Sequence, residues 1–334
     1  MTAPDSPERE RQNPPERERQ NPTERERPQP HLGPLPLSIG GWTCHAIETG
    51  FLWLDGGSMF GSVPKPLWSK LQPPDERNRI RLAMRCLLLE GHGRLVLVDD
   101  GVGDKLSPKL MDIYRVERDV DTLERSLSAL GRRVEDVTDV VLTHLHFDHA
   151  AGSTRRDGDR LVPAFPRARY YVQRRNWDNA SNPNPRERAS YMPENFEPLG
   201  DAGVVTMWEG PQRPWPGVEV FTADGHTRGQ QLVRVHGTEG SLYFVADLIP
   251  TSSHVRIPFV MGYDMAAIET MAEKQAVLER AVDERAWILL EHDATVALGR
   301  PRREGDDFGW DETVLAPGAR DATARAAQAG AGGP

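Results

Sequence analysis

Residues 143–149 read Thr143-His144-Leu145-His146-Phe147-Asp148-His149 and directly follow a short apolar run that predicts a buried strand. Imidazole and carboxylate groups are the usual ligands of zinc and related divalent metals in catalytic sites. On an extended turn, His144 and His146 can point at one metal, while Asp148 and His149 face a second. A polar loop with coincidental histidines is the alternative, and it is weak for four such residues after a strand. The motif therefore predicts part of a two-metal site.

Three later positions repeat this placement of a possible ligand just past an apolar strand. His226 lies in Asp224-Gly225-His226-Thr227-Arg228-Gly229-Gln230, whose glycines allow a tight turn. Asp247 follows the apolar run 242–246, and His292 follows 287–290. Taken singly, Asp247 could cap the next segment and His292 could lie on the surface. Their shared placement predicts that they join the first motif.

The hydrophobic pattern alternates between short β runs and helical stretches. We expect strands at 84–90, 94–99, 139–143, 168–173, 218–223, 231–236, 241–246 and 286–290, with 91–93 as a hairpin turn. We expect helices at 121–130 and 265–282. The apolar face of the second helix is predicted to contain Ile268, Met271, Ala272, Gln275, Leu278 and Val282. Hairpins interrupted by helices favour sheets covered by helices over a regular βαβ array.

Composition limits the organisation and the partners of the chain. Residues 1–31 contain an eight-residue polar repeat and residues 316–334 are rich in Ala and Gly, so both are predicted to be disordered tails around a domain at 32–315. The net charge of −9 does not favour nucleic acid. No apolar stretch approaches a membrane span and no apolar signal segment is found, which predicts a cytoplasmic protein without a membrane partner. Cys44 and Cys86 are too few for a disulfide framework.

The order of these motifs resembles the metallo-β-lactamase fold superfamily over about residues 35–300. The pattern is His-x-His-x-Asp-His, then Asp-Gly-His-Thr, a strand-terminal Asp and a late His. The resemblance implies an α/β fold, an αββα sandwich of two mixed β-sheets flanked by helices, with the site along one edge of the paired sheets. It also implies seven metal ligands. The first metal would be held by His144, His146 and His226, and the second by Asp148, His149 and His292. Asp247 would bridge the two.

The implied cofactor is a pair of divalent metal ions. We expect zinc, and the same ligands also suit manganese, iron or cobalt. Two metals ~3.5–4 Å apart can hold a bridging water whose pKa falls to about 7, which supplies hydroxide at neutral pH. Asp148 or Asp247 would pass a proton to the leaving alkoxide, which is the catalytic role expected of them. Thr143 and Asp224 are candidates to hydrogen-bond the ligand histidines.

Within the superfamily, the resemblance is closest to the branch of N-acyl homoserine lactone lactonases, the quorum-quenching enzymes, and methyl parathion hydrolase. The shared stretches are 54–61, 63–65, 75–78, 98–103, 262–264 and 291–293. The bridging Asp247 argues against true β-lactamases, which lack it. His146 argues against oxygen-reducing diiron members, which have Glu there. Glyoxalase II shares the metal motif, but its helical C-terminal domain is expected to be absent here.

Two departures from that branch affect the expected chemistry. The His-Thr-Pro-Gly-His form reads His226-Thr227-Arg228-Gly229-Gln230, which alters the turn and keeps the ligand. Some lactonases place a catalytic Tyr three residues after the bridging Asp, where this chain has Pro250. Tyr263 and His254 are the candidate substitutes.

The sequence therefore predicts a metal-dependent hydrolase that opens lactones or cleaves esters, with phosphotriesters as further substrates. The small-molecule substrate is expected to contact seven apolar or aromatic residues, for each of which core packing is the alternative role: Met59, Phe60, Trp68, Phe147, Phe259, Met261 and Tyr263. A glyoxalase II-like thioesterase and a non-catalytic metal-binding interaction protein are the competing functions. A homodimer is left open.

Overall fold

The computed structural model describes residues 36–118 and 122–316. The repeats within 1–31, residues 317–334 and Asp121, where a helix was expected to begin, lie outside the described residues. Ala316 is buried, and its N–H donates to the carbonyl of Thr295 at 2.7 Å. The division into two tails and one domain stays a prediction.

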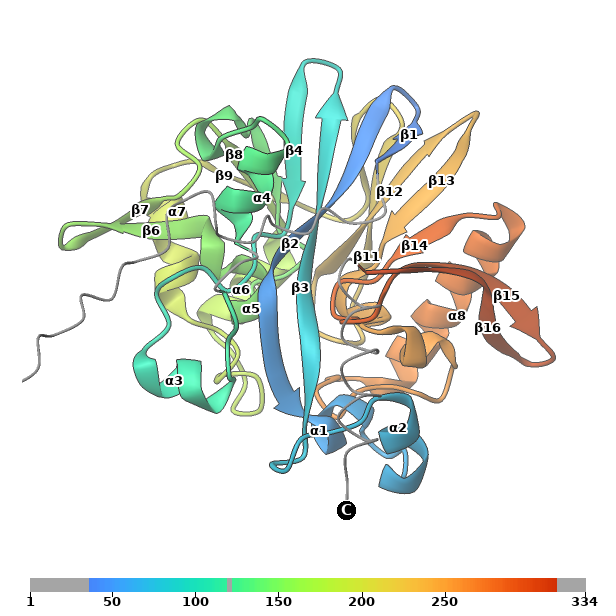
Figure 1. The fold of residues 1–334 in the computed structure, drawn as a ribbon. Coiled ribbons are helices and arrows are strands. Elements are labelled where there is room, and N and C mark those ends of the chain that lie inside the picture. Colours follow the sequence, from blue (N-terminus) through green and yellow to red (C-terminus); the bar gives the residue numbers. More distant parts are fainter. Residues whose placement is uncertain (1–35, 119–121, 317–334) are drawn as a thin grey trace, which may run out of the picture.

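Two mixed β-sheets form the centre of the molecule (Figure 1). The first sheet has the order β1-β2-β3-β4-β5-β8-β9. Its strands are β1 (Leu37–Ile39), β2 (Trp42–Asp55), β3 (Arg79–Gly91), β4 (Arg94–Val98), β5 (Asp139–Val141), β8 (Arg169–Gln173) and β9 (Val205–Trp208). Pairing is antiparallel from β1 to β4 and parallel from β4 to β9. The expected hairpin around residues 91–93 joins β3 to β4, which confirms that prediction.

The second sheet has the order β10-β11-β12-β13-β14-β15-β16, in which only β13 and β14 are parallel. Its strands are β10 (Gln212–Trp215), β11 (Val218–Ala223), β12 (Gln230–Gly237), β13 (Gly240–Phe244), β14 (Trp287–Leu289), β15 (Val296–Glu304) and β16 (Asp307–Leu315). A separate hairpin pairs β6 (Thr154–Asp157) with β7 (Arg160–Pro163). All eight predicted strands exist, with ends displaced by a few residues.

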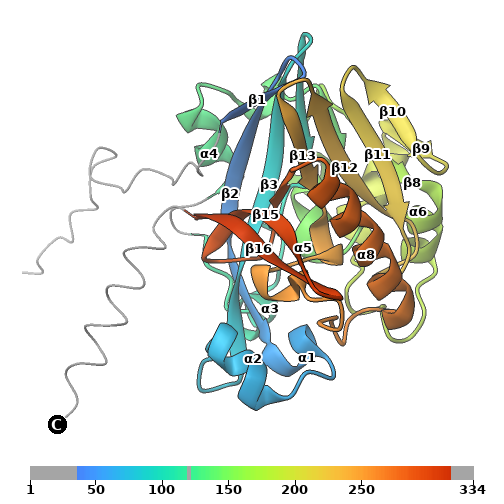
Figure 2. The same cartoon turned by 90° about the vertical axis from the view of Figure 1, so that its right-hand side faces the viewer.

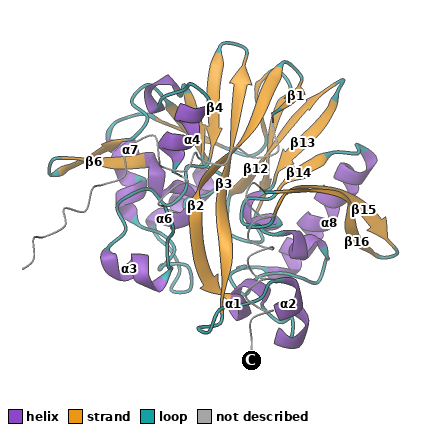
Figure 3. Cartoon of the chain, viewed as in Figure 1, coloured by secondary structure: helices purple, strands orange, loops and turns teal. Residues whose placement is uncertain are grey.

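The helices lie outside the paired sheets (Figure 3). They are α1 (Gly56–Phe60), α2 (Lys65–Leu71), α3 (Pro108–Ile113), α4 (Leu123–Ala129), α5 (Phe147–Ala150), α6 (Arg174–Ser181), α7 (Glu197–Asp201) and α8 (Ala267–Asp283). The 3₁₀ turns are η2 (Val134–Asp136), η3 (Ala151–Ser153), η4 (Pro193–Asn195), η5 (Ala246–Leu248) and η6 (Ser252–Val255). Among the described residues, none of the helices has the length and apolar character needed to cross a bilayer.

Three buried clusters define the layers. Apolar side chains such as Leu87, Val220 and Leu289 fill the space between the two sheets. α4 covers the outer face of the first sheet, where Leu127 packs. α8 lies across the outer face of the second sheet, where Leu278 packs (Figure 2). The predicted αββα sandwich of two mixed sheets is therefore confirmed.

The 14-residue strand β2 was not predicted, because polar residues interrupt its pattern. Glu48 in this strand is buried and forms an ion pair with Arg85 of β3, in which Arg85 Nε lies 2.5 Å from Glu48 Oε1. The register shifts between Glu48 and Phe51, and Gly50 at this point has a φ of 124°. A Cβ on Gly50 would lie 2.6 Å from the Glu117 carbonyl oxygen, so only glycine fits this bulge.

The predicted apolar face of α8 was wrong in part. Ile268 is 77% exposed, whereas the buried residues are Thr270, Lys274, Val277, Leu278 and Ala281. Lys274 is buried because its Nζ donates to three carbonyls, those of His254, Arg256 and Phe259, at 2.6–3.1 Å. A lysine that satisfies loop carbonyls inside the protein cannot be recognised from hydrophobic periodicity.

Candidate metal centre

Four of the predicted ligands lie three residues past the end of a strand. His144 follows β5, His226 follows β11 and His292 follows β14. Asp247 lies in η5 beyond β13. Asp148 lies in the short helix α5, as does His149. These positions bring side chains from both sheets to one edge of the sandwich.

The turn around His226 depends on two glycines. Gly229 has a φ of 73°, which an L side chain rarely adopts. A Cβ on Gly225 would lie 2.3 Å from the backbone N of Thr270 at the start of α8. The expected tight turn is therefore confirmed.

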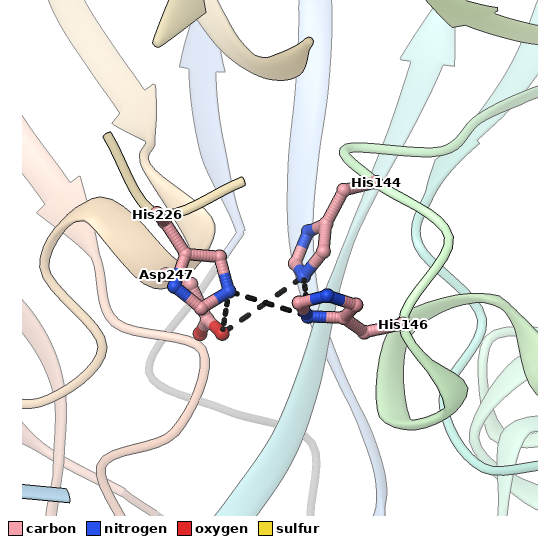
Figure 4. A group of neighbouring side chains, drawn as sticks. All are labelled: His144, His146, His226 and Asp247. Atoms are coloured by element: carbon pink, nitrogen blue, oxygen red, sulfur yellow. Dashed lines mark hydrogen bonds and ion pairs between the residues drawn. The ribbon is translucent and has the colours of Figure 1, made fainter. Parts of the chain in front are cut away.

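Four side chains converge in a first cluster (Figure 4). His144 Nε2 lies 3.0 Å from His146 Nδ1, which lies 3.3 Å from His226 Nε2. Asp247 Oδ2 is 3.0 Å from His226 Nε2 and 3.9 Å from His144 Nε2. All four residues are buried. The ring nitrogens point at one another, and they carry too few protons for every close pair to form a hydrogen bond. This is the arrangement of ligands around a shared cation.

A second cluster joins Asp148, His149 and His292. His149 Nε2 lies 3.2 Å from His292 Nε2 and 3.8 Å from Asp148 Oδ1. Asp247 of the first cluster also contacts the second, because its Oδ1 is 3.0 Å from His292 Nε2 and its Oδ2 is 3.6 Å from His149 Nε2. All seven predicted ligands are therefore brought together.

Further residues fix the orientation of the histidines. Thr143 Oγ1 lies 3.1 Å from His144 Nδ1 and donates to Asp99 Oδ2 at 2.6 Å. The same oxygen of Asp99 is 3.1 Å from His149 Nδ1. His292 Nδ1 lies 2.8 Å from the Ala83 carbonyl oxygen. Thr143 thus contacts a ligand, as expected, whereas Asp99 lies in the shared stretch 98–103 but was assigned no role from the sequence.

Asp224 has a different role from the expected one. Its carboxylate accepts from the backbone N of Gly229 at 2.7 Å and pairs with Arg175. It therefore closes the turn around His226 rather than bonding the imidazole. Asp264 takes that place, with Oδ1 2.9 Å from His226 Nδ1.

The carboxylates make the site strongly attractive to positive charge. Burial lowers the pKa of His226, but Asp247 and Asp264 outweigh it and raise the pKa to about 10. Burial also opposes protonation of His292, yet Asp247 and Glu291 raise its pKa to about 9. Burial raises the pKa of Asp247, and the facing histidines pull it well below its usual range. The residues therefore fit divalent cations in charge as well as in donor type.

A cavity of about 170 Å³ opens beside the two clusters. Four of the predicted substrate contacts line it, together with ligand atoms: Met59, Phe147, Met261 and Tyr263. Phe60, Trp68 and Phe259 do not line it. Phe60 stacks on Trp68 with ring centres 5.3 Å apart, and both are buried under the cavity with Phe259 beside them.

Sequence reasoning missed several residues of the cavity wall. They are Leu54, Leu82, Tyr114, Arg186, Glu187, Ala189, Ser190 and Met265. Tyr114 stacks on Phe147 with ring centres 4.8 Å apart. Residues 186–190 follow α6 in a polar loop without strand or helix pattern, so no signal in the sequence placed them at the site.

Of the two candidate substitutes for the lactonase tyrosine, only Tyr263 lines the cavity. His254 is fully buried, and its Nε2 lies 2.8 Å from the Met59 carbonyl oxygen while its Nδ1 lies 2.7 Å from Thr251 Oγ1. Both ring nitrogens of His254 are therefore engaged in holding the loops below the site.

Comparison with known proteins agrees with this geometry. The model of the metallo-beta-lactamase superfamily matches residues 84–292, which contain all seven residues of the two clusters. The chain belongs to this superfamily. A probable metallo-hydrolase of Mycobacterium tuberculosis is 28% identical over 251 residues, which cover 65% of this chain and 77% of the relative. An N-acyl homoserine lactonase of Bacillus thuringiensis is 26% identical over 227 residues, with 64% and 82% covered.

Solved structures of superfamily members share the fold. A probable metal-dependent hydrolase from Staphylococcus aureus has a TM-score of 0.77 at 28% identity, covering 84% of this chain and 98% of that one. A dizinc quorum-quenching lactonase has a TM-score of 0.69 at 19% identity, covering 84% and 97%, and shows the fold alone. This superfamily member is accordingly a metal-dependent hydrolase.

Proposed function

We propose that the chain uses two divalent metal ions, zinc in the first place, to open lactones or cleave carboxylic esters, with phosphotriesters as further substrates. One observation supports a dinuclear site above all. The carboxylate of Asp247 lies between the two clusters, with Oδ2 3.0 Å from His226 Nε2 and 3.6 Å from His149 Nε2, and Oδ1 3.0 Å from His292 Nε2. A carboxylate in this position suits a bridge between two cations.

The assignment of ligands follows the two clusters. His144, His146 and His226 would hold one ion, and Asp148, His149 and His292 the other, with Asp247 shared. When bound, the pair of ions supplies a hydroxide nucleophile at neutral pH and polarises the substrate's carbonyl or phosphoryl oxygen.

The chain's own residues would place the substrate and move the proton. Apolar side chains such as Leu54, Met59 and Met261 favour an acyl chain or aryl group in the cavity. Asp148 and Asp247 lie at the reacting centre and can carry a proton to the leaving alkoxide. Tyr263 and Tyr114 are protonated at neutral pH, since the ordinary pKa of a phenol is about 10 and partial burial raises it further, so either can donate to the leaving oxygen.

Relatives support the choice of substrate class. The lactonases among them are named for N-acyl homoserine lactones, and one solved structure holds the product N-hexanoyl-L-homoserine at its catalytic metal centre. Pro250 stands where some lactonases have tyrosine, so ring opening here would depend on a different proton donor.

A hydrolysis panel on the metal-loaded protein tests the proposal. Acyl homoserine lactones of increasing chain length, aryl esters, a paraoxon-type triester and S-D-lactoylglutathione cover the competing substrate classes. We expect turnover of lactones or esters, with preference for longer acyl chains, and loss of every activity in His146→Ala. Full activity and full metal content in His146→Ala would contradict the two-metal assignment, and turnover of the thioester alone would favour a thioesterase.

A further inference from the structure

His146 differs from the other ligand histidines in the surroundings of its second nitrogen. Its Nδ1 faces His144 and His226, so Nε2 is left to carry the proton when Nδ1 binds a cation. This Nε2 is buried and, within the described ranges, has no hydrogen-bond partner. A buried N–H without an acceptor is unfavourable, so a partner is expected once the imidazole binds a cation.

The remaining ligand histidines already have a neighbouring oxygen at the nitrogen that points away from the metals. The distances range from 2.8 Å, at the Ala83 carbonyl beside His292, to 3.1 Å, at Thr143 beside His144 and Asp99 beside His149. Metal-binding histidines generally donate their outer N–H to a carboxylate, a carbonyl or water, which fixes the ring. His146 is therefore the one ligand of the proposed site whose orienting group is still to be assigned.

The carboxyl group of Glu187 faces that nitrogen. Its Oε1 lies 4.0 Å from His146 Nε2, and its side chain is 3% exposed. In the part of the chain that the structure describes, no other ion-pair partner lies within that distance of Glu187. A buried carboxylate without a cationic partner is unfavourable. The N–H of a metal-bound imidazole would supply Glu187 with such a partner.

The carboxylate of Glu187 is held in position from three sides. Thr227 Oγ1 donates to its Oε1 at 2.5 Å, and Asn179 Nδ2 donates to Oε2 at 3.2 Å. Asn184 Nδ2 donates to the same Oε2. Thr227 directly follows the ligand His226, so this cluster joins two ligands of the first metal. Such a network fixes the oxygen but leaves Oε1 able to accept a second hydrogen bond.

The backbone keeps the two residues in register. Phe147 N donates to the Ser190 carbonyl at 2.9 Å, and His146 forms an isolated bridge with Tyr191. The separation of 4.0 Å exceeds a normal hydrogen bond by roughly 1 Å, so the imidazole and the carboxylate must move toward each other for the bond to form.

We propose that Glu187 is the positioning residue of His146, accepting its Nε2–H when Nδ1 holds the first metal ion. The inference rests on the proposed two-metal function. Glu187 and its neighbours in residues 186–190 line the catalytic cavity, so occupation of the first metal position also orders this wall. The wall and the metal are thereby coupled through one hydrogen bond.

Metal titration of the metal-free protein tests the inference. Zn²⁺ is added in competition with a chromogenic chelator to the natural protein, to Glu187→Gln and to two controls. Asn179→Ala disturbs the same network on the Oε2 side, and Glu209→Gln removes an exposed carboxylate. We expect one of the two zinc affinities to fall 10–100-fold in Glu187→Gln, and by no more than a few-fold in either control.

A second measurement separates positioning from a purely structural role. The melting temperature of each variant is recorded metal-free and zinc-loaded. We expect Glu187→Gln to melt near the natural protein when metal-free and to gain less from zinc. If Glu187→Gln binds zinc as tightly as the natural protein, or if Glu187→Gln and Asn179→Ala lose equal affinity, the inference is wrong and the proposed function still stands. A natural protein that binds no zinc overturns the proposed function with it.

Discussion

The Oδ1 atom of Asp264 lies 2.9 Å from Nδ1 of His226. The other oxygen of Asp264 accepts from the backbone N of Met261 at 3.0 Å. Met261 lines the cavity, so one buried carboxylate fixes both a metal-site histidine and a part of the wall that faces the substrate. Asp264 therefore stabilises both the proposed metal site and the cavity wall.

Replacing Asp264 should weaken both functions. In Asp264→Ala, the His226 ring loses its acceptor and the 261–264 turn loses an N–H partner. We expect metal affinity to fall about 10–100-fold and KM to rise even at saturating metal. Chelator competition and steady-state kinetics measure the two effects. An unchanged KM at full metal occupancy would show that the wall is held by other contacts.

The ligands could be predicted from sequence because the His and Asp residues follow apolar strands, either directly or, for Asp148 and His149, within the same short motif. Asp99 and Asp264 carry equally specific hydrogen bonds, but the stretches that contain them, 98–103 and 262–264, indicated only the resemblance and gave neither carboxylate a role. Their roles depend on contacts with His149 and His226, which are far away in sequence. Long-range contacts of this kind leave no periodic signal.

The fold class was likewise more predictable than the cavity. The strands that carry the ligands have strong apolar runs, whereas β2 is interrupted by Glu48, which pairs with Arg85 of β3 in the folded protein. For Phe60 and Trp68 the sequence could not distinguish a cavity wall from a core layer. The structure places both rings in the layer beneath.

Phe60 should accordingly affect stability more than substrate binding. Its ring is fully buried and stacks on Trp68, so Phe60→Ala is expected to cost about 3–5 kcal/mol in unfolding free energy. Met261→Ala should instead raise KM for long-chain substrates, because Met261 faces the cavity. Urea unfolding and kinetics on both variants compare the two. The reverse pattern would place Phe60 in the substrate site.

Tyr263 should matter most for substrates with a poor leaving group. Its phenol lines the cavity and stays protonated, so it can donate to an alkoxide. We expect Tyr263→Phe to lower kcat for a lactone at least ~10-fold and to change 4-nitrophenyl ester hydrolysis little, because that phenolate leaves without a proton. The same comparison on Tyr114→Phe tests the other candidate donor. Equal effects on lactone and aryl ester would argue against proton donation.

His254 should make stability depend on pH below neutrality. Burial lowers its pKa from 6.5 to about 3, so between these values the unfolded chain binds a proton that the folded protein excludes. Stability is complete above pH 6.5 and falls as the pH decreases, by about 1.4 kcal/mol per unit. The metal-free natural protein should therefore lose roughly 2 kcal/mol more than His254→Gln between pH 6.5 and 5. If the unfolding free energies of the natural protein and His254→Gln, measured in urea, fell in parallel with pH, His254 would not be the cause.

Removal of the metals should abolish activity and lower stability without changing the fold. The sheets and their apolar layers do not depend on the ligands, but the clustered carboxylates around Asp247 lose the cations that balance them. Ligand linkage predicts about 4 kcal/mol of stabilisation from one site at a thousandfold excess of metal over Kd. We expect chelator-treated protein to keep its far-UV circular dichroism, melt at a lower temperature and recover activity with zinc, manganese or cobalt. Metal analysis run alongside the assay decides the outcome, because full turnover by protein without bound metal would refute the proposed chemistry.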